Sequence, residues 1–272
     1  MSIERVSILG AEVSKVTLDL ALEQIEDWIA HFDGRSRFIV ATGFHGIWVG
    51  FNDPEFRAII NSSDLFCPDG IAPVWLSRLF GTPLPERVPG PDLMRAFVSG
   101  AARKSFFYGD TDETLKALSQ RLSEESPGHE IVGSYSPPFR SLTADEDDGV
   151  VKQINDARPD VLWVGLGLPK QEYWIHAHLG RLHVPVVAAV GAAFRLVSGQ
   201  VSRAPCWLRD AGMEWAWRLA CEPRKLWRRD LVDGPRFLYH ALWEAYRIRS
   251  SRRAIATRVT KPDDATSHQL AS

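Results

Sequence analysis

The chain has 272 residues, 45% of them hydrophobic and 24% charged, with a formal net charge of −2. This composition is typical of a globular protein and excludes a chain that is disordered throughout. The three cysteines are too few for a disulfide framework and too scattered for the paired ligands of a zinc site. The first residues lack the unbroken apolar segment of a signal peptide, and no apolar run reaches the ~20 residues of a spanning helix. We therefore expect a cytoplasmic protein that does not cross the membrane.

Short apolar runs alternate with longer amphipathic runs over residues 1–200, which is the pattern of an α/β domain. A helix is predicted at Leu18–Phe32, where the apolar residues form one stripe, and Pro91 and Pro169 stand near the starts of two others. The predicted strands are Arg5–Leu9, Phe38–Ala41, Leu65–Cys67, Ser105–Tyr108, Glu130–Ser134, Val161–Val164 and Val186–Val190. The pattern predicts a Rossmann-like, largely parallel sheet flanked by helices.

The small net charge hides a basic C-terminal segment. Residues 201–259 contain thirteen basic and six acidic residues, so this segment carries +7 and the rest of the chain −9. Five of the ten tryptophans also fall there. Arginines interleaved with tryptophans suit an anionic membrane surface or a phosphate-rich ligand. Nucleic acid is the alternative partner, but the chain has no zinc-finger or RRM signature, and we expect no nucleic-acid binding.

From Pro205 onward the alternation stops and the sequence reads as helical. An apolar stripe runs beside a set of arginines; it consists of Phe237, Leu238, Ala241, Leu242, Ala245 and Ile248. A basic amphipathic helix of this kind lies on a membrane or docks on a partner. We predict an α/β core at 1–200, a helical basic appendage at 201–259 and a disordered tail at 260–272.

Ligands of open α/β sheets bind beyond the carboxyl ends of the strands, so polar residues directly after predicted strands are candidates. Thr42 and His45 follow the second predicted strand in the run ATGFHG, whose glycines let a ligand approach the backbone. Asp69 follows the third strand in the run PDG and precedes a helix predicted at Ile71–Phe80. Each has an ordinary alternative: the first run can be a loop and helix cap, and Asp69 can be a helix N-cap instead of a general base.

Arg87 and Asp92 belong to the run ERVPGPD, in which an arginine precedes a glycine and a predicted helix start. An arginine can bind a diphosphate through two parallel hydrogen bonds, and a helix N-terminus adds backbone donors. The run is therefore a candidate anion site. A surface salt bridge is the alternative reading of Arg87.

Gln171 lies in the run GLGLPKQE, after the strand predicted at Val161–Val164. The glycines resemble half of a dinucleotide fingerprint, but the third glycine is missing and the run comes late in the chain. A nicotinamide oxidoreductase is therefore not expected. Gln171 projects from the first turn of a predicted helix, where its amide can hydrogen-bond to a base or a sugar.

Gly109 begins the run GDTD, and we count it among the substrate-binding residues. Asp110 and Asp112 have the spacing with which many sugar-nucleotide enzymes hold a divalent metal. The run is also an ordinary acidic helix start, which is the reading we favour. The weaker match at Asp145–Asp147 is read in the same way, and we expect no metal site.

Several other classes of site lack support. The chain has no P-loop, no nucleophile elbow of the G-x-S-x-G type and no H-E-x-x-H helix, so a P-loop NTPase, a typical α/β hydrolase and a zincin are not expected. His176, His178 and His183 lie near one another in the sequence. Their helix and loop context predicts solvated surface positions and not metal ligands.

Three ordered runs resemble those of a known family. They are CPDGIAPVWLSRLFGTPLPERVPGPDLM at Cys67–Met94, GLGLPKQEYW at Gly165–Trp174, and GAAFRLVSGQVSRAPCWLRDAGMEWAWRLACEPRKLWRRDLVDGPRFL at Gly191–Leu238. The chain is similar over roughly residues 3–240 to the WecG/TagA/CpsF family of bacterial glycosyltransferases. The resemblance implies an inverting, metal-independent transfer of a sugar from a UDP-sugar to a polyprenyl-diphosphate-linked saccharide, without a cofactor, in exopolysaccharide or cell-wall polymer synthesis.

The resemblance also implies roles for individual residues. Asp69 matches the aspartate of the family's D-G motif, which is proposed to be the general base. Thr42 matches a pocket threonine, and His45 is expected to replace the function of the asparagine that the family usually has nearby. Gln171 matches a pocket glutamine near the nucleotide or sugar. Arg87 and Asp92 match the family's E-R-v-x-G-x-D motif. Arg195 departs from the family's usual aspartate, which points to altered donor or packing chemistry.

The basic C-terminal segment resembles the family segment that closes over the active site and helps membrane attachment. The matching residues are Arg203, Arg218, Arg224, Arg228 and Arg229. The resemblance therefore implies a peripheral protein on the inner face of the cytoplasmic membrane, with arginines that stabilise the leaving UDP. A nucleotide-binding regulatory protein at the membrane surface, without transfer activity, is the alternative function.

Overall fold

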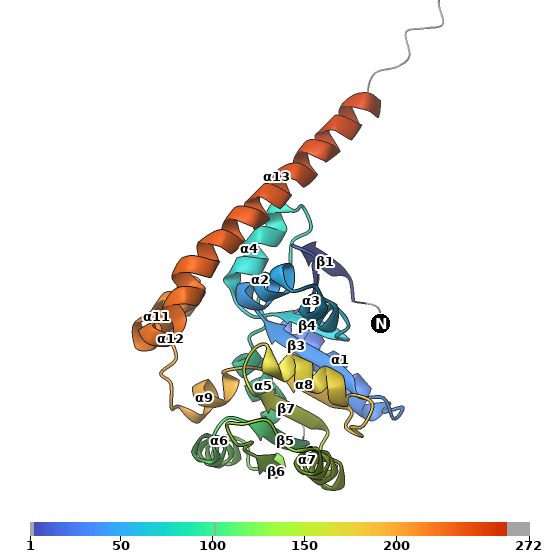
Figure 1. Cartoon of the computed structure of the whole chain (residues 1–272), viewed down its shortest axis with the longest axis vertical. Coiled ribbons are helices and arrows are strands. Elements are labelled where there is room, and N and C mark those ends of the chain that lie inside the picture. The colour runs from blue at the N-terminus through green and yellow to red at the C-terminus, as the bar shows by residue number, and fades with distance from the viewer. Residues whose placement is uncertain (1–2, 101, 260–272) are drawn as a thin grey trace, which may run out of the picture.

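The computed structural model describes residues 3–100 and 102–259 (Figure 1). The disordered tail predicted at 260–272 lies outside the described residues. The predicted α/β architecture is confirmed, with a central sheet, helices on both of its faces and a helical C-terminal segment.

The central sheet has six strands in the order β4-β3-β8-β7-β5-β6, and every neighbouring pair is parallel. The strands are β3 (Arg37–Thr42), β4 (Leu65–Pro68), β5 (Lys104–Gly109), β6 (Glu130–Tyr135), β7 (Val161–Gly165) and β8 (Val186–Ala189). From β5 the chain continues to β6 on one side, and from β7 it continues to β8 on the other. The strand order thus reverses between β5 and β7, and such a reversal opens a crevice at the carboxyl ends of the strands.

Helices cover both faces of the sheet because its strands are apolar on both sides. In β3, Phe38 and Val40 enter one core while Ile39 and Ala41 enter the other. The first core also takes up α2 (Phe44–Asn52), α3 (Pro54–Asn61), α4 (Ile71–Leu79), α7 (Ala144–Ala157) and α8 (Lys170–His178). The second takes up α1 (Leu18–Ala30), α5 (Gly90–Val98), α6 (Asp112–Glu125) and α9 (Ala193–Ser198).

A separate antiparallel hairpin precedes α1. It consists of β1 (Arg5–Ile8) and β2 (Ala11–Ser14), and its apolar residues join the first core. The pattern of residues 1–200 predicts the first of these strands and not the second. The turn residues Leu9 and Gly10 have φ angles of 50° and 81°, which suits the two-residue turn of a tight hairpin.

The C-terminal segment is helical, as expected. It comprises α10 (Cys206–Asp210), α11 (Glu214–Cys221), α12 (Pro223–Arg228), the π-helical turn η1 (Arg229–Asp233) and α13 (Gly234–Val259). The long helix α13 runs past α4 and extends beyond the core (Figure 1). In the part of the chain that the structure describes, no helix is both long enough and apolar enough to cross a membrane.

The apolar stripe of α13 packs largely on the protein's own core, so the prediction that it lies on a membrane or a partner is corrected in part. Phe237, Ala241 and Ala245 are buried in the first core, where α13 contacts α2 and α4, and Ile248 packs against the same core. Leu238 and Leu242 remain exposed. Four of the six stripe residues therefore hold the helix on its own core.

Candidate active site

A cleft of about 2170 Å³ lies at the carboxyl edge of the sheet, between the strand ends and the C-terminal helices. Eight of the predicted site residues line it: Thr42, His45, Asp69, Arg87, Gln171, Arg203, Arg218 and Arg229. These residues come from β3, α2, the loop after β4, the loop before α5, α8 and the C-terminal segment. The fold thus brings together side chains that are up to 187 positions apart, from Thr42 to Arg229.

Asp69 is placed by the tight passage from β4 into α4. Its backbone N–H donates to the carbonyl oxygen of Thr42 at 3.0 Å. Gly70 follows with a φ of 111° and is the N-cap residue of α4, which has no side-chain capping bond. The prediction that Asp69 is a helix N-cap is therefore wrong. Its carboxylate does not cap α4, and Asp69 lines the wall of the cleft.

The surroundings of Asp69 make it a stronger base than an ordinary aspartate. Burial raises its pKa to about 6, and the negative charge of Glu214 adds to this. The charge of Arg218 and a hydrogen bond from the Gly90 backbone act in the opposite direction. At neutral pH the carboxylate is mostly ionised and has a pKa close to the operating pH, which is the range that suits a general base.

A chain of alternating charges lies beside Asp69. Arg87 Nη1 donates to Glu214 Oε2 at 3.2 Å, and Glu214 Oε1 lies 3.6 Å from Arg203 Nε. Arg203 donates in turn to both carboxylate oxygens of Asp92, at 2.5 and 2.7 Å. Arg87 does form a salt bridge, but the pair lies in the cleft wall and is about four-fifths buried. Asp92 itself does not line the cleft and reaches it through Arg203.

Two more polar residues of the cleft differ in how they are held: the amide of Gln171 is fixed by hydrogen bonds, whereas the ring of His45 has a buried nitrogen without a partner among the described residues. Gln171 Oε1 accepts from the Gly191 backbone N–H at 3.0 Å, and its Nε2 donates to Glu172 Oε1 at 2.8 Å. Burial raises the pKa of Glu172 to about 7.

The Nδ1 atom of His45 is buried without a hydrogen-bond partner among the described residues. Burial, together with the charge of Arg229, lowers the pKa of His45, which favours the neutral form of its ring.

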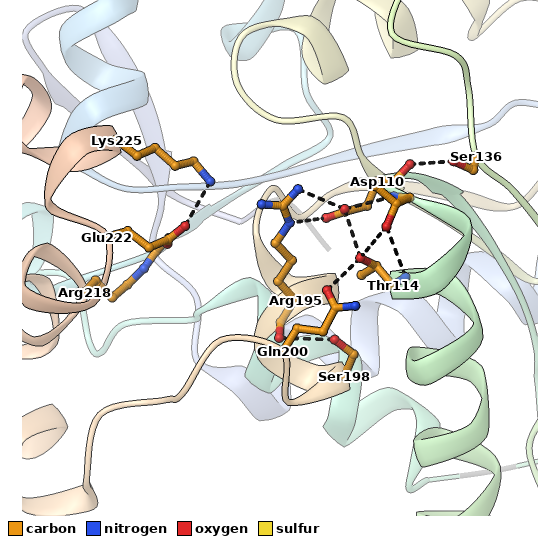
Figure 2. Close-up of polar contacts among 10 residues, drawn as sticks. Asp110, Thr114, Ser136, Arg195, Ser198, Gln200, Arg218, Glu222 and Lys225 are labelled. Atoms are coloured by element: carbon orange, nitrogen blue, oxygen red, sulfur yellow. Dashed lines mark hydrogen bonds and ion pairs between the residues drawn. The ribbon is translucent and has the colours of Figure 1, made fainter.

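Figure 2 shows an ion pair that the sequence did not predict, between Arg195 of α9 and Asp110. Arg195 Nε donates to Asp110 Oδ2 at 2.7 Å, and Nη2 donates to Oδ1 at 3.0 Å. Thr114 Oγ1 lies 3.1 Å from Asp110 Oδ1 and 2.7 Å from Gln200 Oε1. Burial acts to raise the pKa of Asp110, but the hydrogen bonds and charge of Arg195 hold it below the usual value.

The GDTD run is a helix start, as we favoured. Thr111 caps α6 by accepting from the Thr114 backbone N–H at 3.2 Å, and Asp112 is the first residue of the helix. Gly109 does not line the cleft, although Asp110 beside it does. Its φ of 127° and its close approach to the Gly165 backbone favour a glycine at this point. The second acidic run is also a helix start, in α7, capped by Thr143 and Glu146.

The arginines of the C-terminal segment fall into two groups. Arg218 and Arg229 line the cleft, and Arg229 donates to both oxygens of Asp230 at 2.6 and 2.9 Å. Arg224 and Arg228 are exposed and do not line the cleft. Arg218 and Lys225 both lie beside Glu222, across the cleft from Arg195 (Figure 2).

One prediction about the histidines is wrong. His176 and His183 are exposed, as expected, but His178 is buried and its ring stacks on Trp174 at 4.3 Å between ring centroids. Its Nε2 lies 2.7 Å from Asp147 Oδ2. His178 faces the core because it is one turn after Trp174 on the inner side of α8. Among residues 3–100 and 102–259, no cluster of three or more His, Cys, Asp or Glu residues could hold a metal ion.

Comparison with known proteins decides the family. The model described as "Glycosyl transferase WecG/TagA/CpsF family" matches residues 6–251. The chain belongs to this family. In this member of the family, Thr42, Asp69 and Gln171 line the cleft at the carboxyl ends of the strands.

Curated relatives of this glycosyltransferase share one name, N-acetylglucosaminyldiphosphoundecaprenol N-acetyl-beta-D-mannosaminyltransferase. The relative from Bacillus spizizenii is 30% identical and the match covers 79% of this chain and 84% of the relative. The one from Bacillus subtilis is 33% identical, over 72% and 75%. The one from Staphylococcus aureus is 29% identical, over 86% and 91%.

Sequence reasoning missed several charged residues of the cleft. Glu214, Lys225 and Asp230 line it together with Asp110 and Arg195. The tryptophans and arginines of the C-terminal segment pointed to the segment as a whole, but nothing in the sequence singled out Glu214, Lys225 or Asp230 as residues of the cleft. The cleft contains a carboxylate that can accept a proton and guanidinium groups that can stabilise a departing anion.

Proposed function

We propose that this glycosyltransferase moves a sugar from a UDP-sugar to a hydroxyl group of a polyprenyl-diphosphate-linked saccharide, with inversion at the anomeric carbon and without a metal. The observation that carries the proposal is Asp69, a carboxylate with a pKa of about 6 in a cleft lined by arginines. A base of this strength suits the activation of a sugar hydroxyl, and arginines suit the binding of a diphosphate.

The proposed reaction is a single displacement. Asp69 accepts the proton of the acceptor hydroxyl while the hydroxyl oxygen attacks the anomeric carbon of the donor. The bond from that carbon to the diphosphate oxygen breaks, and UDP leaves with the bonding electron pair. Because attack comes from the face opposite to the leaving group, the configuration at the anomeric carbon is inverted.

Arginines take the role that a metal ion plays in other sugar-nucleotide enzymes. Arg203 and Arg218 line the cleft. Arg218 Nε is buried with no hydrogen-bond partner among the described residues, whereas Arg203 Nε faces Glu214 at 3.6 Å. We propose that these two arginines stabilise the negative charge that builds up on UDP as the glycosidic bond breaks.

The acceptor and the location are proposed from the relatives and from the surface. The names of the curated relatives specify an N-acetylglucosaminyl-diphosphoundecaprenol acceptor. We propose an acceptor of the same class here, in the synthesis of an exopolysaccharide or a cell-wall polymer. Tyr239, Trp243 and Tyr246 of α13 are exposed, and Arg247 stacks on Trp243 at 4.7 Å from the ring centroid. Such a surface suits peripheral attachment to the cytoplasmic membrane.

The test is UDP release from a panel of UDP-sugars, with a short polyprenyl-diphosphate saccharide as acceptor and with EDTA present. The panel contains N-acetylmannosamine, its uronic acid, glucose and glucuronic acid as donor sugars. Asp69→Asn is compared with Asp156→Asn, which removes a charge from an exposed ion pair on α7. We expect acceptor-dependent release that survives EDTA, is lost in Asp69→Asn and is retained in the control.

Two results would contradict the proposal. Release that depends on a divalent cation would refute transfer without a metal. Binding of UDP without release from any donor would favour the alternative, a nucleotide-binding regulatory protein.

A further inference from the structure

Glu214 links the C-terminal helices to the core at the cleft. It is the first residue of α11, and its carboxylate contacts Arg87 on the core at 3.2 Å and Arg203 on the connecting segment at 3.6 Å. All three side chains are largely buried, with exposed fractions of 16 to 21%. Arg87 and Glu214 are separated by 127 positions in the chain, so the contact exists only when α11 is seated on the core.

Two other acidic residues of the C-terminal helices have different partners. Glu222 lies beside Arg218 and Lys225, and Asp230 binds Arg229. Those pairs form within the C-terminal helices themselves and would persist if the helices moved away from the core. The Glu214 pairs would not.

Glu214 also acts on Asp69. Its negative charge helps to raise the pKa of that carboxyl, whereas Arg218, one turn later on α11, lowers it. Residues four positions apart lie on the same face of a helix, and both side chains line the cleft. When α11 is seated on the core, the negative charge of Glu214 and the positive charge of Arg218 therefore both come close to Asp69.

We propose that Glu214 is a positioning residue which couples the seating of α11 to the reaction. It holds Arg87 and Arg203 side by side at the cleft and places its own negative charge near Asp69. The inference rests on the proposed function, because that function assigns Arg203 to the leaving diphosphate, and the inference adds Arg87. It adds that closure of the C-terminal helices delivers a carboxylate as well as arginines.

Arginines that are already aligned lose less side-chain freedom when the diphosphate binds. A guanidinium has five N–H donors, and Glu214 occupies only one edge of each arginine. Arg87 uses only Nη1 for Glu214, which leaves Nε and Nη2 for phosphate oxygens. On Arg203, Nε faces Glu214 and both Nη atoms donate to Asp92, so only the second hydrogen of each Nη remains for a phosphate oxygen. Glu214 therefore organises the site without competing for every donor.

The experiment compares wild type with Glu214→Gln, Glu214→Ala and Glu214→Asp, and uses Asp156→Asn as the charge control. Glu214→Gln keeps the size of the side chain and an oxygen for Arg87 but removes the charge. The thermal unfolding midpoint of each variant checks that the fold is intact. Two readouts need no turnover: the affinity for UDP, and the infrared titration of the Asp69 carboxyl band, identified by its loss in Asp69→Asn.

In Glu214→Gln we expect the pKa of Asp69 to fall by at least about 0.5, because a nearby like charge is removed. We expect UDP affinity and kcat/KM to fall by about tenfold, as a charged hydrogen bond to the arginines is lost. The acid limb of the pH profile moves to lower pH together with the infrared midpoint. Glu214→Asp recovers part of the loss and Glu214→Ala recovers none.

An unchanged infrared midpoint together with unchanged UDP affinity in Glu214→Gln would overturn the inference. The same would follow if Asp156→Asn shifted the midpoint equally, because the effect would then be one of net charge. Failure of the proposed function has a different signature. In that case wild type releases no UDP from any donor, while the midpoint and the UDP affinity still report on Glu214.

Discussion

A Cβ atom on Gly43 would lie 2.0 Å from the backbone oxygen of Asp69. The two segments that follow β3 and β4 therefore touch at this point, and the contact fixes the backbone that carries the Asp69 side chain. The φ of Gly43 is −102°, which other residues adopt without strain, so the contact alone requires glycine. The close approach of the backbones is what brings Asp69 to the wall of the cleft.

Gly43→Ala is expected to push Asp69 out of place and to lower kcat by about 100-fold, because a displacement of about 1 Å at a catalytic group has an effect of this size. Gly128→Ala is the matched control, since a Cβ there meets nothing within 4 Å. Steady-state kinetics of both variants provide the check. Equal activity in the two would show that the contact does not position the base.

Asp69→Asn is expected to stabilise the fold above pH 6 while it abolishes transfer. The pKa of Asp69 rises from 3.8 to about 6 in the folded chain. The folded state thus holds the proton more tightly, and the free energy of unfolding falls as the pH rises from about 4 to about 6. Asparagine escapes this cost, which is worth up to about 3 kcal/mol. Urea unfolding at pH 4 and pH 8 measures the difference, which should vanish at the lower pH.

Arg195→Ala is expected to destabilise the fold by about 1–2 kcal/mol, because it leaves the buried carboxylate of Asp110 without its charged partner, with only the hydrogen bonds from Thr111 and Thr114 remaining. The exposed fraction of the two side chains is 37% for Arg195 and 6% for Asp110, so most of the cost falls on the aspartate. The double variant Arg195→Ala/Asp110→Ala should lose less than the sum of the two single variants. Additive losses in thermal or urea unfolding would show that the two residues do not interact.

Replacing Tyr239, Trp243 and Tyr246 by serine is expected to weaken binding to anionic vesicles by about tenfold or more, because interfacial aromatic residues contribute much of such binding. These side chains are exposed and do not line the cleft. Phe32→Ser, at an exposed position after α1, is the control. Cosedimentation with vesicles provides the measurement, and unchanged binding of the triple variant would place the membrane contact elsewhere.

The predicted sheet could be read from the sequence because its strands are short apolar runs separated by amphipathic helices. The order of the strands could not, since pairing such as that of β3 with β8 joins segments about 150 residues apart. The hairpin partner β2 was missed although its sequence, AEVS, alternates apolar and polar residues. Its turn signal, Gly10, was available in the sequence.

The candidate site was predictable where a polar residue directly follows a strand, as Asp69 does. It was not predictable where a helix returns to the core from far along the chain, as Glu214 does. The basic segment was recognised by composition, but composition does not say which side of a helix faces inward. On α12 the buried residue is Leu226, so Arg224 and Arg228, on the other side, face solvent.

The pH dependence of kcat/KM tests whether Asp69 is the general base, because it reports the pKa of the base in the free enzyme. With a UDP-sugar donor and a polyprenyl-diphosphate saccharide acceptor, we expect activity to be lost below a midpoint of about pH 6, the pKa of Asp69. We also expect this limb to disappear with the activity in Asp69→Asn. A midpoint near the ordinary aspartate value of 3.8, or an active Asp69→Asn enzyme with the limb unchanged, would show that the buried Asp69 is not the base.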